Sequence, residues 1–359
     1  MPDPNAIVAL VTRLEPSLDQ ASASDLLRQR PEGVVVELEG YEALRLAEGD
    51  GAAGRLDILE GLRRLRTPVY LEIDPATRRI TRLLIPLVTR VSQVVEGQGA
   101  VSVVLEASHA HHQLSRERGD FAELLATLRE AADKGSWLAV TENDAHEVID
   151  VRLWPHEPFR PERVEVHLKP SWWRWLLCFF RRCCVTSSRA QELFDLCATK
   201  TCSPTTVPPP CIPFLYPDDG CWARAHEMCR LMELEGAQPR KVWIDGSLHT
   251  PTRNHPNCIV HWGWHVAPTL CVRRGFLRSQ EMVIDPSLFT TPVSQATWKG
   301  AQGDPGATLT PSDATLYWRY VMPSDPGYVD TNIRLAYYRL QLQNRSLGAN
   351  GPPPYAHCP

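Results

Sequence analysis

The chain has 359 residues, of which 43% are hydrophobic and 22% are charged, proportions that are ordinary for a globular protein. This length is sufficient for two domains with separate hydrophobic cores. The net charge of −4 lacks the basic excess of nucleic-acid-binding proteins, so no nucleic-acid partner is expected. All 11 cysteines lie at or after Cys178, so the two halves of the chain differ in chemistry.

Residues 1–170 are predicted to form a separate α+β domain. The clearest helix covers 121–134, where Phe121, Leu124 and Leu128 form one apolar stripe and Gly135 ends the helix. The region contains no phosphate-binding loop, no dinucleotide-binding turn and no internal repeat that would indicate a function. The other expected elements are two short helices within 6–30, a helix over 56–65, and strands over 34–38, 69–73, 79–87, 101–106, 137–141 and 148–154.

Two groups of polar residues in this domain have the composition of a cation site. They are His109, His111 and His112 in one group, and Glu142, Asp144, His146 and Glu147 in the other. A solvated loop explains the first group more simply, and a turn with capping carboxylates explains the second. We therefore expect no metal and no cofactor.

The N-terminus has no basic region, and its apolar run is interrupted by Thr12 and Arg13, so it does not resemble a secretory signal peptide. A cytoplasmic location is the simplest expectation. The cysteine-rich second half instead suits a disulfide-bonded secreted domain, and export by a route without such a signal would reconcile the two observations. Cys202 with Cys211 and Cys258 with Cys271 are candidate pairs, although spacing alone cannot assign them.

Residues 171–207 are predicted to join two domains. The segment 171–184 is rich in Trp, Arg and Cys, and it is too short and too interrupted by Arg174 to cross a bilayer. The preferred interpretation is that its aromatic side chains pack on one of the domains. The alternatives are a membrane-interface segment acylated on one of its cysteines, and a segment that occupies the catalytic cleft. A short helix over 191–198 and a stiff proline-rich spacer over 203–210 are expected to follow.

The segment 216–228 has the features of a nucleophile presented by a tight turn. Pro217 and the two aspartates after it are turn and N-cap residues, and Gly220 permits a sharp bend before Cys221. A helix over 221–235 is predicted to start at this cysteine, with Gly236 as its stop. The positive end of the helix dipole favours a thiolate, so Cys221 is a candidate nucleophile.

A thiolate nucleophile requires a base and a group that orients the base. His265 lies in a predicted strand over 258–267, and Asp285 ends a predicted strand over 282–285. One helix followed by neighbouring strands can bring Cys221, His265 and Asp285 together. His226 and His261 are rival bases, and Asp245 is the rival orienting residue; the pair Asp245–Gly246 is interpreted as a hairpin turn.

The remaining elements complete a helix packed on an antiparallel sheet within residues 208–343. Further strands are expected over 241–244, 271–274, 316–322 and 333–343, a loop over 299–313 and a flexible tail over 344–359.

Three segments, 213–228, 264–267 and 284–289, resemble the bacterial protein-glutaminase family. Members of this family are protein-glutamine deamidases with a transglutaminase-like, papain-like Cys-His-Asp core. The resemblance covers 208–343 and implies that Cys221 is the nucleophile, His265 the base and Asp285 the orienting residue. It also implies a protein or peptide substrate that presents glutamine. Trp222 stands where the family is expected to have a tyrosine.

The expected reaction is hydrolysis of a glutamine side-chain amide through a thioester on Cys221. Trp222, Trp262 and Trp264 are candidate walls of the substrate pocket. The three catalytic residues alone do not separate deamidation from transglutamination or peptide hydrolysis, so a transglutaminase, a cysteine protease and a non-catalytic binding or delivery module remain alternatives. The N-terminal domain is expected to be an inhibitory pro-part, a targeting module or a substrate-recruiting domain.

Overall fold

The computed structural model describes residues 6–19, 21–30, 32–158, 184–203, 211–275 and 278–359. The chain divides into two compact units. The N-terminal unit comprises Met1–Phe159 and Leu340–Pro352, and the C-terminal unit comprises Arg160–Arg339 and Pro353–Pro359. The segment 171–183, with two of the cysteines considered for acylation, lies outside the described residues. Among the residues that are described, no helix combines the length and the apolar character needed to cross a bilayer.

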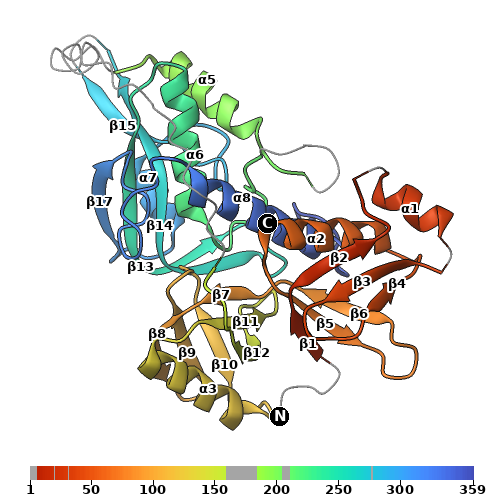
Figure 1. The fold of residues 1–359 in the computed structure, drawn as a ribbon. Helices are drawn as coiled ribbons and strands as arrows, with labels where there is room; N and C mark the ends of the chain where they lie inside the picture. Colours follow the sequence, from red (N-terminus) through yellow and green to blue (C-terminus); the bar gives the residue numbers. More distant parts are fainter. Residues whose placement is uncertain (1–5, 20, 31, 159–183, 204–210, 276–277) are drawn as a thin grey trace. The chain divides into compact units, whose positions relative to one another are not determined.

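The N-terminal unit combines three-stranded antiparallel sheets with helices α1, α2 and α3 and the last part of α8 (Figure 1). Its sheets have the orders β1-β5-β6, β2-β3-β4, β10-β9-β8 and β12-β11-β7. The elements are β1 (Ala6–Ala9), β2 (Val11–Glu15), α1 (Ala23–Gln29), β3 (Val34–Leu38), β4 (Leu44–Leu46), α2 (Ala52–Leu65), β5 (Val69–Ile73), β6 (Ile80–Leu84), β7 (Leu87–Thr89), β8 (Val91–Glu96), β9 (Ala100–Leu105), β10 (His112–Ser115), α3 (Phe121–Lys134), β11 (Leu138–Glu142) and β12 (Val148–Leu153).

Helix α3 occupies the predicted residues, with Leu124 and Leu128 buried and Gly135 in the left-handed conformation at its end. The prediction of two helices within 6–30 was wrong for the first half of that stretch. All four residues of β1 are buried and pair with β5, so long-range pairing overrides the local pattern there.

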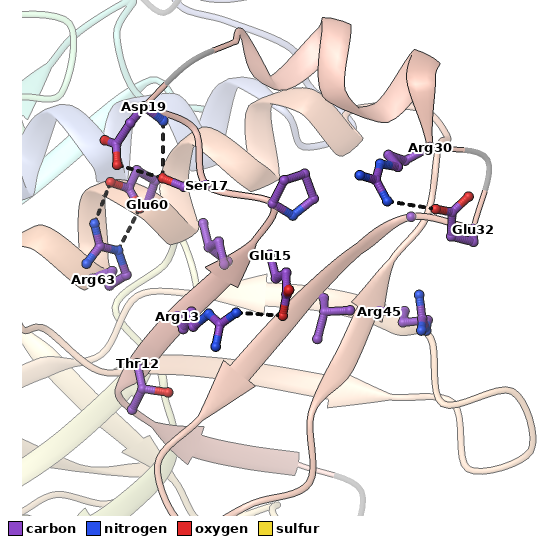
Figure 2. Close-up of a pocket in the computed structure, with 14 residues that line it drawn as sticks. Thr12, Arg13, Glu15, Ser17, Asp19, Arg30, Glu32, Arg45, Glu60 and Arg63 are labelled. Carbon is purple, nitrogen blue, oxygen red and sulfur yellow. Dashed lines mark hydrogen bonds and ion pairs between the residues drawn. The ribbon is translucent and has the colours of Figure 1, made fainter.

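The N-terminal unit also contains an open polar groove of about 740 Å³ (Figure 2). Arginines and acidic residues line it in ion pairs, including Arg13 with Glu15 at 2.8 Å and Arg63 with Glu60 at 2.7 Å. Its charges are largely paired, and none of the predicted catalytic residues lines it.

The C-terminal unit is built on one five-stranded antiparallel sheet with the order β16-β15-β14-β13-β17 (Figure 1). Its elements are α5 (Ser187–Ala198), α6 (Cys221–Leu234), β13 (Arg240–Pro251), β14 (Ile259–Arg273), β15 (Ser279–Val283), β16 (Val293–Ser294), α7 (Gln295–Ala301), β17 (Thr308–Asp313) and the first part of α8 (Val329–Ser346). A mixed helix-and-sheet fold was predicted, and this part of the prediction is confirmed.

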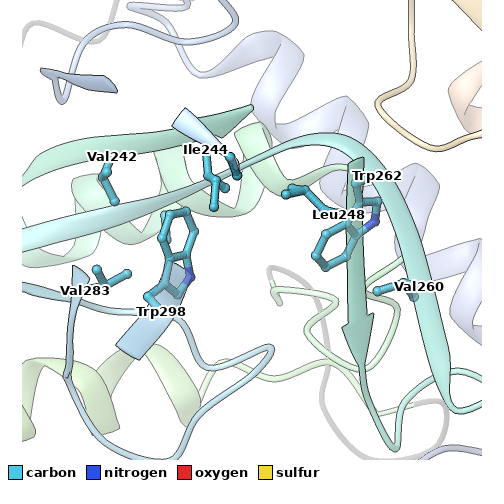
Figure 3. Close-up of a cluster of buried hydrophobic side chains, with 9 residues drawn as sticks. Val242, Ile244, Leu248, Val260, Trp262, Val283 and Trp298 are labelled. Atoms are coloured by element: carbon cyan, nitrogen blue, oxygen red, sulfur yellow. The ribbon is translucent and has the colours of Figure 1, made fainter. Parts of the chain in front are cut away.

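The two faces of this sheet carry different helices because side chains alternate along β13. Val242 and Ile244 point to one face, where they pack with Trp298 of α7 (Figure 3). Lys241 points to the other face, and its Nζ donates a 3.0 Å hydrogen bond to His226 Nδ1 of α6. Helices α6 and α7 therefore cover opposite faces of the sheet.

Several predicted elements of the C-terminal unit require correction. Strand β13 continues through Asp245 and Gly246, with a register shift before Leu248 in place of the predicted hairpin turn. The predicted loop over 299–313 contains the end of α7 and all of β17. Residues 333–343, predicted as a strand, lie in α8, and 316–322 form no named strand.

Three disulfides hold the C-terminal unit within the described residues. The predicted pair Cys202–Cys211 is confirmed, whereas Cys258 pairs with Cys358 and not with Cys271. Cys271 pairs with Cys184, which excludes acylation of Cys184 in this form. The expected flexible tail is therefore tied down at Cys358, beside the buried Tyr355.

Candidate active site

Cys221 is the first residue of α6, and the turn before it is fixed from several directions. Gly220 has φ +80°, and a side chain at this position would clash with the ring of Tyr338. The buried guanidinium of Arg224 donates to the backbone carbonyls of Tyr216, Pro217 and Asp219. One arginine therefore satisfies three carbonyls of the turn and holds the thiol at the helix N-terminus.

The turn is also attached to the sheet and to the following loop. Trp262 Nε1 of β14 donates to the carbonyl of Asp218 at 2.9 Å. The Asp218 carboxylate lies 3.2 Å from His255 Nε2, and both side chains are buried. These contacts fix the position of Cys221 relative to β14.

His265 in β14 and Asp285, which lies just after β15, form a buried hydrogen-bonded pair. His265 Nε2 lies 3.0 Å from Asp285 Oδ2, and each residue is at most 2% exposed. Asp285 Oδ2 also accepts a 2.8 Å hydrogen bond from Trp298 Nε1, and Asp285 Oδ1 accepts one from the Ser287 backbone at 3.2 Å. The carboxylate is therefore oriented from three sides.

The imidazole of His265 lies between two indole rings. The ring of Trp262 is stacked on it at 4.5 Å and the ring of Trp298 lies at 5.5 Å, with interplanar angles of 19° and 30°. Figure 3 shows these two tryptophans in the same buried apolar cluster. This packing leaves the ring little rotational freedom, which suits a base of fixed orientation.

The thiol lies beside β14, the strand that carries the imidazole. The Cys221 sulfur accepts a hydrogen bond from the backbone of Val266, the residue that follows His265, and it lies within electrostatic range of Asp285. With Nε2 bound to the carboxylate, Nδ1 is the ring nitrogen available to exchange a proton with a thiol. The structure thus brings the three predicted residues into one site.

From the sequence, the helix dipole is expected to favour a thiolate at Cys221, but the electrostatics of the site favour the neutral thiol. Burial raises the pKa of Cys221, and the nearby charge of Arg224 opposes this only in part. For Asp285, burial acts to raise the pKa, but the hydrogen bonds from His265 and Trp298 outweigh it, so its pKa lies below the usual value. The buried site therefore holds a neutral thiol and an ionised carboxylate.

The three candidate pocket tryptophans have different environments. Trp222 and Trp262 are fully buried, and Trp222 stacks on Trp318 at 4.4 Å. Trp264 is half-buried and contacts Tyr320, which is 58% exposed, at 5.8 Å. In this structure only Trp264 has the partial exposure of a pocket wall.

The rival residues lie outside the site. His226 accepts from Lys241 on the other side of α6, and burial lowers its pKa to about 3. His261 is exposed and faces His249, with 2.7 Å between their Nδ1 atoms. Asp245 accepts hydrogen bonds from Arg319 and Tyr320. Each rival thus has a partner elsewhere.

Trp298 and Arg224 are site residues that the sequence reasoning missed. Trp298 lies 13 residues after Asp285 in no recognisable motif, and only the fold brings its N–H to the carboxylate. Arg224 lies on the predicted helix, three residues after the cysteine. An arginine one turn after a predicted helix start was the available signal, because its guanidinium can bond the carbonyls of the preceding turn.

In the C-terminal unit, the described residues contain one close group of metal-ligating types, Cys258, His357 and Cys358. Its two cysteines are joined as a disulfide, so they offer no thiolates to a metal.

Comparison with known proteins identifies the domain that carries this site. Residues 190–302, which include Cys221, His265 and Asp285, match the family model described as glutaminase. A search of curated protein sequences found no match. The chain therefore contains a protein-glutaminase-family domain in its C-terminal part, whereas the N-terminal unit matches no family model.

Solved structures of pro-protein-glutaminase and protein-glutaminase are similar to this chain. The crystal structure of pro-protein-glutaminase has a TM-score of 0.50 and 21% identity, and the match covers 76% of this chain and 97% of that chain. This likeness shows a shared fold over more than the C-terminal unit alone. The crystal structure of protein-glutaminase has a TM-score of 0.37 and 26% identity, covering 49% of this chain and 100% of that chain. The NMR structure of protein-glutaminase from Chryseobacterium proteolyticum has a TM-score of 0.38 and 28% identity, covering 42% of this chain and 84% of that chain.

Proposed function

We propose that the C-terminal unit is a cysteine amidohydrolase that converts glutamine side chains of proteins to glutamate and releases ammonia. The observation that carries this proposal is the buried His265–Asp285 hydrogen bond beside the thiol at the start of α6. These residues lie within the stretch that matches the glutaminase family model. The proposal requires no metal or cofactor.

In the first half of the reaction, His265 takes the proton of the Cys221 thiol, and the sulfur attacks the carboxamide carbon of glutamine. The backbone N–H of Cys221 has no partner within the helix at this position, so it can donate to the developing oxyanion. His265 then gives its proton to the nitrogen, the carbon–nitrogen bond breaks, and ammonia leaves a thioester on Cys221.

In the second half, His265 removes a proton from water, which attacks the thioester carbon. The carbon–sulfur bond breaks, glutamate is released and the thiol recovers its proton. Throughout, Asp285 holds the imidazole through Nε2 and stabilises its charged form. The Trp298 N–H and the Ser287 backbone keep the carboxylate in place.

The same three residues also support amine transfer or peptide cleavage, so product analysis decides between the reaction classes. A peptide with one glutamine is incubated with the chain, with and without a primary amine, and the products are weighed by mass spectrometry. Conversion of glutamine to glutamate with release of ammonia supports the proposal. Attachment of the amine, or a cut in the peptide backbone, would assign a transglutaminase or a protease instead.

Cys221→Ala and Cys229→Ala form a matched pair for this assay, because both cysteines are buried and reduced on the same helix. We expect Cys221→Ala to abolish ammonia release and Cys229→Ala to retain it. Loss of activity in both variants, or in neither, would contradict the assigned role of Cys221.

We further propose that the described form is latent and that the N-terminal unit acts as an inhibitory pro-part. Cys221, His265 and Asp285 are all at most 2% exposed. A glutamine side chain therefore reaches the thiol only after the residues that bury the thiol have moved. The proposal is also supported by the fold shared with the structure named pro-protein-glutaminase. Targeting and substrate recruitment are the other roles considered for this unit.

Cleavage at the boundary between the units distinguishes these roles. A protease recognition sequence is inserted between Phe159 and Arg160, and ammonia release is measured before and after cleavage. Because Leu340–Pro352 also belongs to the N-terminal unit, ammonia release is measured again after residues 1–159 have been removed from the cleaved chain. An increase supports inhibition, and activity that is unchanged after their removal supports targeting or recruitment. A truncation inside 171–207 is unsuitable because Cys184 and α5 belong to the C-terminal unit.

For the working environment, we propose an oxidising compartment. Three disulfides in the C-terminal unit support this proposal, because such bonds are rare where thiol reductants are abundant. Peptide mapping of the chain isolated from its own cells, with free thiols blocked at lysis, should recover Cys258 linked to Cys358. Recovery of both cysteines as blocked thiols would contradict the proposal.

A further inference from the structure

The N-terminal unit brings two histidines and a glutamate together around one point. His112 is the first residue of β10, Glu142 is the last residue of β11, and His146 lies in the turn between β11 and β12. Their ligand atoms all lie within 4.8 Å of one another. His112 Nδ1 is 2.6 Å from Glu142 Oε2, and His146 Nδ1 is 2.8 Å from Glu142 Oε1. Both imidazoles thus direct the same type of nitrogen to one carboxylate.

We propose that His112, Glu142 and His146 bind a zinc ion that fastens the β11–β12 turn to β10. Two imidazole nitrogens with one carboxylate are a donor set that zinc uses, with the fourth position left for water. This site is independent of the proposed deamidation. His109 and His111 are not members of the ligand group, although the sequence places them beside His112.

The surroundings of His112 match those of a metal-binding histidine. His112 is 1% exposed, and its second ring nitrogen, Nε2, lies 2.7 Å from the Ser108 hydroxyl. Without a metal, Nδ1–H donates to Glu142. When a metal ion takes the place of that proton, Nε2–H donates to the Ser108 hydroxyl and the Nδ1 lone pair binds the metal. Such a partner on the outer ring nitrogen is a regular feature of zinc sites because it fixes the tautomer and the ring orientation.

The position of His146 is set by the backbone. Its N–H donates to the Asn143 carbonyl at 3.0 Å, and its own carbonyl accepts from the Gln113 N–H at 3.0 Å. The second bond joins the turn to β10 directly beside His112. The two histidine rings are consequently 5.3 Å apart and nearly perpendicular. The ligands are therefore held in place by the main chain of two separate segments.

The geometry requires only a small adjustment for a metal. Two atoms bound to zinc at tetrahedral angles lie about 3.3 Å apart, given bond lengths near 2.0 Å. The present nitrogen–oxygen distances of 2.6 and 2.8 Å are hydrogen-bond distances, and small side-chain rotations lengthen them. The Glu142 side chain is 19% exposed, which provides a path for the ion from solvent.

The donor set also suits a cation. Glu142 supplies one carboxylate oxygen to each of the two histidines, so a single carboxylate joins the three ligands. The competing explanation is that the three residues form a hydrogen-bonded network and bind no ion.

Metal content distinguishes the two explanations. Full-length chain is stripped with a chelator, dialysed against buffered zinc and analysed for zinc per chain, beside Glu142→Gln and His146→Asn. Asparagine tolerates the left-handed conformation of His146, which has φ +56°, so the second variant preserves the turn. Exposed His156, also in the N-terminal unit, supplies the control His156→Ala.

We expect wild type and His156→Ala each to bind one more zinc ion per chain than Glu142→Gln or His146→Asn binds. Zinc should also raise the Tm of wild type and not that of His146→Asn. Ser108→Ala should keep the stoichiometry and lose about 10- to 100-fold in affinity, as expected for a positioning residue. Equal zinc content in wild type and His146→Asn, with both folded by circular dichroism, would overturn the proposal.

Discussion

Asp285 is the residue on which the geometry of the proposed base depends. It contacts His265, Trp298 and the Ser287 backbone, and it is buried with its charge intact. A buried carboxylate of this kind orients the imidazole and stabilises its protonated form during turnover. Its replacement is therefore expected to affect the rate more than substrate binding.

Asp285→Asn should lower kcat by roughly 10²- to 10⁴-fold, because an amide can stabilise the wrong imidazole tautomer. The measurement is steady-state ammonia release, with exposed Asp313→Asn on β17 as the control. A change in KM with kcat preserved would contradict the orienting role.

The same residue gives a pH-dependent contribution to stability. The pKa of Asp285 is lower in the folded state than the usual value near 4, so its ionised form stabilises the fold above about pH 4. This contribution is lost as the pH falls through the folded-state pKa. The difference in Tm between wild type and Asp285→Asn should therefore shrink from pH 6 to pH 3. A difference that stays constant over this range would show that the Asp285 charge does not contribute to stability.

Trp298 is predicted to act through Asp285. Trp298→Phe keeps a ring beside His265 but removes the N–H that donates to the carboxylate at 2.8 Å. Loss of this donor should raise the pKa of Asp285, reduce kcat by about tenfold and move the acidic limb of the pH–rate profile to higher pH. An unchanged profile would show that Trp298 serves packing alone.

At this scale the sequence predicted what local chemistry determines. The turn residues and Gly220 predict that Cys221 starts a helix, because a tight turn and a helix start are each encoded within a few neighbouring positions. The bond from Trp298 to Asp285 and the contacts of Arg224 are absent from such patterns, because they depend on the final fold.

Among the elements, α3 and α6 were predicted to within a residue, whereas α8 was predicted as a strand over 333–343. Leu335, Tyr337, Tyr338, Leu340 and Leu342 are all buried, so apolar residues occur around most of the helix. An all-round apolar distribution has no clear helical period, and the alternation of large residues then imitates a strand.

The C-terminal tail, residues 353–359, is predicted to stabilise the C-terminal unit through its disulfide. Cys358 is tied to Cys258 across 100 residues, and the Tyr355 N–H donates to the Arg253 carbonyl at 2.7 Å. Closing so long a loop restricts the unfolded chain, so Cys358→Ser should lower the free energy of unfolding by about 2–4 kcal/mol. Chemical denaturation with and without reductant measures this. If reductant lowers the stability of the variant as much as that of wild type, the effect belongs to the other disulfides.

For the whole molecule, the division into units could not be predicted in full. The sequence placed a boundary in 171–207, but contacts assign Leu340–Pro352 to the N-terminal unit. Leu340 and Leu347 pack against Gly61 and Gly54 of α2, where any larger side chain would meet them. Because these contacts join residues far apart in the chain, only the folded structure reveals them.

Latency predicts a change in thiol reactivity. Cys197, Cys221 and Cys229 are the reduced cysteines among the described residues, and all are buried. In the intact chain all three should react slowly with iodoacetamide. After cleavage between Phe159 and Arg160 and removal of residues 1–159, Cys221 alone should react faster, as measured by peptide mapping. Fast labelling of Cys221 in the intact chain would contradict the latent state.

Ammonia release from a glutamine-containing protein such as casein tests most directly whether Cys221 is the nucleophile. The chain is used after cleavage between Phe159 and Arg160 and removal of residues 1–159. Wild type is compared with Cys221→Ala and Cys229→Ala. We predict that wild type and Cys229→Ala release one ammonia for each glutamate formed, and that Cys221→Ala releases none. Equal release by the wild-type and Cys221→Ala proteins would show that Cys221 is not the nucleophile.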